Sequence, residues 1–388
     1  MKINPDILKK EIINTLKGQG FLLTNDVQEI VPCEGNEKDG IRSLHKERRK
    51  RKVNSEFNFI KRNIKSLSRF FADGTHINTE MFSPRLLPVK VNTEMSDLFR
   101  LSTLLWSVPV SQGFGRRLRF LVIDESNEKL VGLFAIGDPV FNLRVRDELI
   151  GWDHYQRAKN LYHVMDIFIL GAIPPYSNLL CGKLMGMMAA SNEVRKIVYQ
   201  KYVGSKTYIT QQKKKPHLVL LTTASALGRS SIYNRIKYKD LKLYQRIGET
   251  KGWGHFHLGD GTFEKMRQYL DQVRHPIVRR NRFGQGPNWK MRTIRICLEE
   301  LGLSSDLLRH GVKREVFWIP LAENFREYLL GLDMIPHYHD LPLTELVEYF
   351  KERWFIPRAK RVMEYMDISH TDTLEEIGKG IRQYLRSE

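Results

Sequence analysis

Cysteine is scarce in this sequence, and no stretch of it is continuously apolar. The 388 residues contain three cysteines, Cys33, Cys181 and Cys297, which lie far apart and form no Cys-x-x-Cys pair. So few thiols exclude a disulfide framework or a thiolate zinc finger and favour a reducing compartment. The first residues, MKINPDILKK, lack the apolar core of a signal peptide, and no run approaches the roughly eighteen apolar residues of a membrane span. We therefore expect a cytoplasmic protein without a membrane partner.

Positive charge is what the sequence has in excess. Lys and Arg number 63 against 44 Asp and Glu, which gives a formal net charge of +19, while 41% of the residues are hydrophobic. The hydrophobic content is typical of a globular chain, and the length suffices for two or three compact units. A field this positive favours a polyanionic partner, and nucleic acid, most simply DNA, is the first choice. A basic surface without a specific ligand is the alternative.

Composition divides the chain into three consecutive regions. Residues 1–72 predict a basic N-terminal helical segment, residues 84–260 a mixed α/β core, and residues 261–388 a basic, mainly helical C-terminal region. In the core, apolar runs and amphipathic stretches follow one another as strand, helix, two hairpin strands, strand, long helix, strand, helix and two strands. This order predicts an α/β fold with a mixed sheet.

Two segments combine dense positive charge with residues that suit nucleic acid. KERRKRK, residues 46–52, has six cations in seven positions and leads into an amphipathic helix over residues 57–71. VRRNRFGQGPNWKMRTIR, residues 278–295, interleaves cations that can pair with phosphate and aromatic rings on which bases can stack. A solvated basic face and intramolecular packing of the aromatic rings are the respective alternatives. The predicted nucleic-acid-binding residues are Arg48, Arg49, Lys50, Arg51, Arg279, Arg280, Arg282, Trp289, Lys290 and Arg292.

The order of elements in the core resembles the GNAT-type N-acyltransferase fold. The resemblance implies that the fourth strand, predicted over residues 163–171, and the helix after it carry a pyrophosphate loop for acyl-coenzyme A. The loop here reads AIPPYSNLLCGKLMGMM, in which Gly182 fits the small-residue pattern, whereas Leu180 stands where a glycine is expected. If acyl-coenzyme A is the cofactor, Asn178, Gly182 and Lys183 are its predicted contacts. The competing interpretation is a loop that kept its shape and lost its ligand.

Tyr233 is the first candidate catalytic residue. LTTASALGRSSIYNRIKY, residues 221–238, predicts a strand, a polar turn and a helix over about residues 229–237. The GNAT resemblance implies a tyrosine general acid on the helix after the fifth strand, and Tyr233 falls there. A phenol with a pKa near 10 suits protonation of a thiolate leaving group. Packing of Tyr233 in the core is the alternative.

Asp166 is the second candidate catalytic residue. It lies in the apolar strand HVMDIFILG, where alternation predicts that it shares a face with Val164, Phe168 and Leu170. A buried carboxylate is costly unless it is paired, and such groups often have shifted pKa values and a chemical role. A structural salt bridge to Arg144 or Arg146 is the alternative.

No metal site is predicted. Two groups combine histidine with aspartate, namely His255, His257 and Asp260, and His337, His339 and Asp340. Two histidines and a carboxylate can hold a divalent ion, but spacing fixes no third ligand in either group. The first pair is expected on a strand over residues 253–259, where half-buried histidines are the simpler interpretation.

A closer resemblance covers nearly the whole chain. The blocks GRRLRFLVIDESNEKLVGLFAIGDPVFNLRVRDELIGWD, LGAIPPYSNLLCGKL, LVLLTTASALGRSSIYNRIKY, GWGHFHL, GQGPNWKMR and LLRHGVKREVFWIPLAEN together resemble the DruA family of the Druantia anti-phage defence systems. The resemblance implies a bacterial defence operon with a large helicase-like partner, and it supplies no established chemistry.

These observations lead to one main hypothesis and two alternatives. The main hypothesis is an anti-phage defence component that engages DNA or a DNA-bound complex through its basic segments and retains a GNAT-like, degenerate pocket. The first alternative is an acyltransferase that modifies a nucleobase or a protein amine, with Asp166 as base and Tyr233 as acid. The second is a metal-dependent nuclease built from residues such as Asp138, Asp166 and His255.

Overall fold

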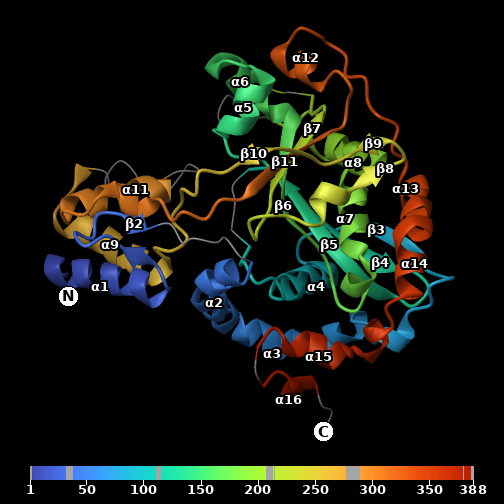
Figure 1. Cartoon of the computed structure of the whole chain (residues 1–388), viewed down its shortest axis with the longest axis horizontal. Helices are drawn as coiled ribbons and strands as arrows, with labels where there is room; N and C mark the ends of the chain where they lie inside the picture. The colour runs from blue at the N-terminus through green and yellow to red at the C-terminus, as the bar shows by residue number, and fades with distance from the viewer. Residues whose placement is uncertain are drawn as a thin grey trace. The chain divides into compact units, whose positions relative to one another are not determined.

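Distant segments of the chain come together in two units. The computed structural model describes residues 2–31, 38–110, 115–206, 213, 215–276, 289–378 and 380–385. Unit 1 consists of Met1–Arg49, Ser225–Arg229 and Glu249–Glu315, and unit 2 consists of Lys50–Ala224, Ser230–Gly248 and Val316–Glu388. Figure 1 shows the elements of both units.

Unit 2 is built on a seven-stranded mixed sheet with the strand order β10-β11-β7-β6-β5-β4-β3. The strands are β3 (Pro84–Pro88), β4 (Arg117–Asp124), β5 (Lys129–Gly137), β6 (Val164–Ala172), β7 (Leu220–Ala224), β10 (Gln245–Glu249) and β11 (Glu315–Pro320). β3 to β6 pair as antiparallel neighbours, β7 pairs antiparallel with β11, and β6 and β7 form a parallel pair. The predicted α/β fold with a mixed sheet is confirmed.

Helices cover both faces of the sheet, which explains why its central strands are apolar on both sides. In β5 every residue after Lys129 is buried. One face packs against α7 (Cys181–Ala189) and α13 (Leu343–Phe350), and the other packs against α3 (Phe57–Leu67) and α4 (Glu94–Thr103).

The helix predicted over residues 177–202 is divided in the structure. A 3₁₀ turn (Tyr176–Leu179) comes first, followed by α7 and then by α8 (Asn192–Tyr202). Leu180 separates the first two because it adopts a left-handed conformation with φ of 63°. The Ser191 side chain caps the start of α8 by accepting a hydrogen bond from the Val194 amide.

Smaller helices complete unit 2. They are α5 (Arg144–Ile150), α6 (His154–Asn160), α12 (Phe325–Leu330), α14 (Ile356–Ala359), α15 (His370–Glu375) and α16 (Arg382–Leu385). A π-helical turn over Lys351–Phe355 leads from α13 into α14, where Pro357 occupies the first turn and needs no intrahelical N–H bond.

In the described part of unit 1, three helices pack around one apolar core. These are α1 (Pro5–Gly18), α9 (Asp260–Gln272) and α11 (Trp289–Glu300), which share the core with a short hairpin of β1 (Leu22–Leu23) and β2 (Ile30–Val31). Asn4 caps α1 as its position before Pro5 indicates, with Oδ1 accepting from the Asp6 amide at 2.9 Å.

Along the chain, β2 is followed by α2 (Lys38–Ser55). One local prediction for unit 1 is wrong. Residues 253–259 were expected to form a strand, but they form turns with one isolated bridge between Trp253 and Arg309. His255 and His257 therefore do not share the face of a strand.

Candidate functional site

Strands β6 and β7 pair over three positions and then separate. Val164–Asp166 align with Leu220–Thr222, whereas β6 continues to Ala172 and β7 to Ala224. Immediately after the last aligned position, the Thr223 hydroxyl donates a hydrogen bond to the Ile167 carbonyl at 2.8 Å. A side chain thus replaces the backbone ladder at the point where the two strands diverge.

A β-bulge in β6 lies at the same point. In its pairing with β5, Ile167 aligns with Ile136 and Ile169 aligns with Ala135, so that Phe168 is the extra residue. Bulges redirect side chains and are frequent beside functional sites. The bulge reverses the alternation, and Leu170 consequently packs on the α7 side of the sheet. The prediction that Leu170 shares a face with Asp166 is wrong for this reason.

Asp166 forms no salt bridge with any described residue. The two expected partners are engaged elsewhere, because Arg144 pairs with Glu148 and Arg146 lies 2.6 Å from Asp147. The Asp166 carboxylate instead accepts a hydrogen bond from the Thr222 hydroxyl at 2.9 Å.

The surroundings of Asp166 change its acidity. Burial raises the pKa of the carboxyl to about 6, although the Thr222 hydrogen bond and the charge of Arg146 act in the opposite direction. Part of the side chain still reaches solvent. A carboxyl with a pKa close to the pH of a cell can accept a proton and release it again, as a general base must.

Register places Asp166 in a row of residues that crosses five strands. The row runs from Arg117 through Gly137, Asp166 and Thr222 to Trp318. Residues aligned in this way point to the same face of a sheet. Asp166 therefore lies between the cationic Arg117 on one side and the indole of Trp318 on the other, with no side chain at Gly137.

Tyr233 lies in a 3₁₀ turn, Tyr233–Arg235, and not in the helix expected over residues 229–237. Its ring stacks on that of Tyr244, with centroids 5.1 Å apart, and meets Phe317 edge-on at 5.4 Å. Burial raises the pKa of its hydroxyl to about 12, a hydrogen bond with Thr223 lowers it, and the charge of Asp166 raises it further. Tyr233 is thus both packed in the core and near Asp166, and it stays protonated at neutral pH.

The residues predicted to contact a cofactor lie around the start of α7. Asn178 is half-buried in the preceding 3₁₀ turn, and its carbonyl accepts a hydrogen bond from Arg358 Nε at 3.1 Å. Gly182 is buried, and a Cβ there would lie 3.2 Å from the Ile232 side chain. Lys183 is only 8% exposed, with its Nζ 4.5 Å from the centroid of the Trp354 ring.

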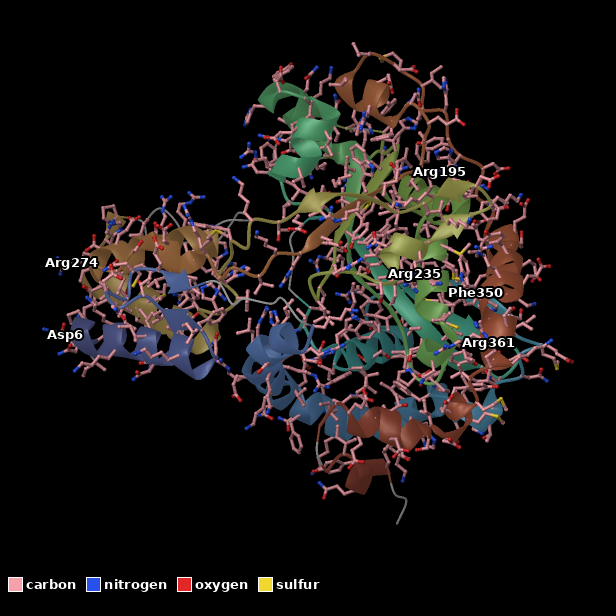
Figure 2. All side chains as sticks on the ribbon, in the orientation of Figure 1. Asp6, Arg195, Arg235, Arg274, Phe350 and Arg361 are labelled. Atoms are coloured by element: carbon pink, nitrogen blue, oxygen red, sulfur yellow. The ribbon has the colours of Figure 1, made fainter. Side chains whose placement is uncertain are left out.

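Lys183 is a buried cation that has no counter-ion among the described residues. Within the part of the chain that the structure describes, its ammonium group forms no hydrogen bond or ion pair. Burial, together with the charges of Arg235 and Arg353, lowers its pKa to about 8. Figure 2 labels Arg235, which belongs to the same turn as Tyr233. Three cations from three elements thus surround the N-terminus of α7, where backbone N–H groups also favour an anion.

The predicted nucleic-acid contacts near α11 are only partly described. Arg279, Arg280 and Arg282 lie outside the described residues. Trp289 is half-buried and meets Phe263 edge-on at 5.3 Å, so its ring packs within unit 1. Lys290 is also half-buried, with Nζ 4.7 Å from the Phe263 ring centroid, and Arg292 is exposed.

The other predicted contacts lie on α2, where two are half-buried and two are exposed. Arg48 and Arg49 are half-buried, and Lys50 and Arg51 are exposed. Three further exposed cations, Lys61, Arg62 and Lys65, continue along α3. These three are not among the nucleic-acid contacts predicted from the sequence. Their position between the apolar residues of an amphipathic helix is the signal that could have found them.

Unit 1 contains a cluster of buried histidines that sequence reasoning missed. His45 is fully buried, stacks on Phe256 with centroids 4.4 Å apart, and has no hydrogen-bond partner on either ring nitrogen. His257 donates from Nε2 to the Leu307 carbonyl at 2.7 Å, and its ring centroid lies 5.6 Å from that of His310. Among the described residues, no group of three or more His, Cys, Asp or Glu side chains has the arrangement of a metal site.

Comparison with known proteins identifies the family. The sequence model described as Druantia protein DruA matches residues 35–331, which extend from before α2 to the end of α12. The chain belongs to the DruA family. A curated DruA relative from Escherichia coli (strain UMEA 4076-1), named Druantia protein DruA, is 44% identical over 359 residues, or 92% of this chain and 88% of the relative. No solved structure matches. In the described part of this DruA family member, no helix is long and apolar enough to cross a membrane.

Proposed function

We propose that this member of the DruA family acts in anti-phage defence by engaging nucleic acid, most simply DNA, through a basic face on α2 and α3. The basic face consists of Lys50, Arg51, Lys61, Arg62 and Lys65, all of which are exposed. The observation that carries the proposal is that none of these five cations forms an ion pair with a described residue. Other proteins of the same defence operon, including a helicase-like subunit, are the proposed partners.

Two acidic residues of this region are engaged by cations outside the face. Glu56 is buried and paired with Lys52 and Arg100, and Glu94 is paired with Arg69 at 2.7 Å. Cations that nearby carboxylates do not neutralise attract phosphate and release its counter-ions on binding. The face is therefore free to meet a polyanion.

Packing makes the face a rigid platform. On the opposite side of α3, Phe59, Ile60, Ile64 and Leu67 are buried in the core of unit 2. The helix cannot rotate without exposing these side chains, so its charges are held in a fixed row. Such a row suits the regular spacing of phosphates along a nucleic-acid backbone.

The test is the salt dependence of binding to duplex and single-stranded DNA. Replacing three cations together (Lys61→Gln, Arg62→Gln and Lys65→Gln) is expected to reduce the slope of log K against log salt by between about 2 and 3, because each phosphate contact contributes about 0.9. The matched control removes the same charge from exposed lysines elsewhere in unit 2, namely Lys90→Gln, Lys237→Gln and Lys242→Gln. Equal slopes for the two triple variants would contradict the proposal.

A second candidate function, acyl transfer, is favoured by the site between β6 and β7. These are the fourth and fifth strands of the large sheet along the chain, where the GNAT resemblance implies a pyrophosphate loop and a tyrosine acid. The unpaired Lys183 at the start of α7 supports an anionic cofactor, and the raised pKa of Asp166 supports a proton acceptor.

Calorimetric titration with acetyl-coenzyme A and with inorganic pyrophosphate tests this candidate. Both probes are expected to bind the wild type and to bind Lys183→Met at least about tenfold more weakly, because a charge-assisted contact is lost. Asp166→Asn is expected to retain the binding of acetyl-coenzyme A, since it lies on another element. Absence of heat with both probes at millimolar concentration would remove acyl transfer and leave the nucleic-acid role.

A further inference from the structure

A pocket of about 310 Å³ lies beside α8 in unit 2, apart from the residues of the candidate site. Its lining residues are Arg195, Lys196, Tyr199, Gln200, Pro216, His217 and Tyr338. The four from α8 are spaced so that they project from one side of the helix. No lining residue is acidic, and aromatic rings and cations predominate.

The aromatic walls come from three separate segments. The guanidinium of Arg195, a residue labelled in Figure 2, lies 3.8 Å from the centroid of the Tyr338 ring. The rings of Tyr199 and His217 lie 5.7 Å apart, centroid to centroid. His163 Nδ1 bonds the His217 carbonyl at 3.2 Å, which holds that wall from the interior. The backbone at His217 is thus held by His163, and the other two contacts join lining residues to one another.

The charge around the pocket is positive. Arg195 Nη2 donates to Asn192 Oδ1 at 3.1 Å, and Asn192 Nδ2 donates in turn to Asp340 at 2.6 Å. This chain of hydrogen bonds orients the guanidinium while keeping the carboxylate of Asp340 on the far side of Asn192. Lys196 is exposed at the rim, and Lys215 is exposed directly before Pro216. Burial and the charge of Lys215 lower the pKa of His217, so its imidazole is neutral at pH 7.

We propose that this pocket binds a nucleobase together with its attached phosphate. A flat aromatic base can stack on an aromatic ring of the pocket wall, and every base can stack in this way. Arg195 and Lys196 supply the charge that a phosphate requires. An apolar ligand would leave the two cations unused, and a free phosphate would leave the aromatic walls unused. The inference goes beyond the basic face on α2 and α3 and does not depend on it.

Titration with adenosine 5′-monophosphate, adenosine and ribose 5-phosphate tests the two halves of the ligand. The nucleotide is expected to bind at least about tenfold more tightly than either fragment, because only it uses both the rings and the cations. Arg195→Gln and Lys196→Gln are each expected to weaken the nucleotide about tenfold or less while changing adenosine little. Tyr199→Leu is expected to weaken both the nucleotide and adenosine, since it removes a stacking surface. Equal binding of nucleotide and ribose 5-phosphate, or no nucleotide binding at millimolar concentration, would overturn the proposal.

Two further comparisons distinguish a free nucleotide from an unpaired base within a strand and control for misfolding of the variants. Tighter binding of single-stranded oligonucleotide than of nucleotide, with the same sensitivity to Lys196→Gln, would support an unpaired base within a strand. The reverse order would support a free nucleotide, and both results agree with the pocket as proposed. Lys90→Gln makes the same charge change at an exposed position outside the basic face and is expected to leave nucleotide binding unaltered. Lys196 is exposed, so its variant should fold, and unchanged nucleotide binding by that variant and by Arg195→Gln would refute the assignment.

Discussion

Acidification from pH 7 to pH 5 is expected to destabilise unit 1 through its buried histidines. Burial, with the charges of Arg314 and Arg48, lowers the pKa of His45 to about 3. Burial, with His257, Arg314 and His45, does the same for His310. His257 has a pKa of about 4 for the same main reason, with the hydrogen bond to Leu307 opposing the shift and His255 adding to it. All three are therefore neutral in the folded protein over this range of pH.

The magnitude follows from the difference between the folded and unfolded pKa values. An unfolded histidine titrates near 6.5, so these histidines contribute full stability above that pH and lose it as the pH falls towards their folded values. Each pH unit between the two pKa values costs about 1.4 kcal/mol per group, which is about 2 kcal/mol per histidine at pH 5. Three such groups would remove about 6 kcal/mol, a large share of the stability of an ordinary domain.

Urea denaturation at pH 7, 6 and 5 measures this loss. Hydrogen exchange of peptides from α9 and α11 is the signal that reports on unit 1. His45→Phe keeps a ring stacked on Phe256 and removes one titrating group, so the loss between pH 7 and pH 5 should be about 2 kcal/mol smaller than in the wild type. His337→Phe changes an exposed histidine of unit 2 and is the control. The same pH dependence in His45→Phe and the wild type would refute the reasoning.

Three other predictions concern unit 2. Thr222→Val should raise the pKa of Asp166 above its value of about 6, as followed by carboxyl NMR, because the hydroxyl that stabilises the carboxylate is lost; an unchanged or lower value would contradict the geometry. Lys183→Met should increase the free energy of unfolding at pH 7 by about 2 kcal/mol in urea titrations, since a buried unpaired ammonium is removed, and a decrease would indicate an undetected partner. Gly74→Ala should lower the thermal midpoint strongly, because a Cβ there would lie 1.9 Å from the Tyr365 carbonyl oxygen, whereas Gly40→Ala, with open space around it, should not.

Local patterns predicted the large sheet well where burial on both faces demands continuous apolar runs. The apolar run from Lys129 to Gly137 has the bounds of β5, and the strand predicted over residues 163–171 differs from β6 by one residue at each end. Such runs are informative because helices cover both faces, so no polar position interrupts them. Asn4 before Pro5 likewise predicted the start of α1, because capping depends only on neighbouring residues.

The catalytic roles of Asp166 and Tyr233 stay predictions, made on separate grounds for each residue. The structure brings the two close enough for the charge of Asp166 to affect the pKa of Tyr233. The bulge at Phe168 could not be predicted, because it depends on the register with β5. The absence of a salt bridge at Asp166 also depends on other residues, since Arg146 pairs with its neighbour Asp147.

The sequence by itself determined the alternation of strands and helices, the excess of positive charge and membership of the DruA family, because each is written in neighbouring residues or in the order of motifs. Only the tertiary structure decided that His45, far away in the chain, stacks on Phe256, that the described residues bury Lys183 without offering it a counter-ion, and that β6 and β7 separate after three aligned positions. These features depend on burial and on register between distant segments. The contacts that set burial and register form only when distant segments meet in the folded chain, so no local pattern of residues contains them.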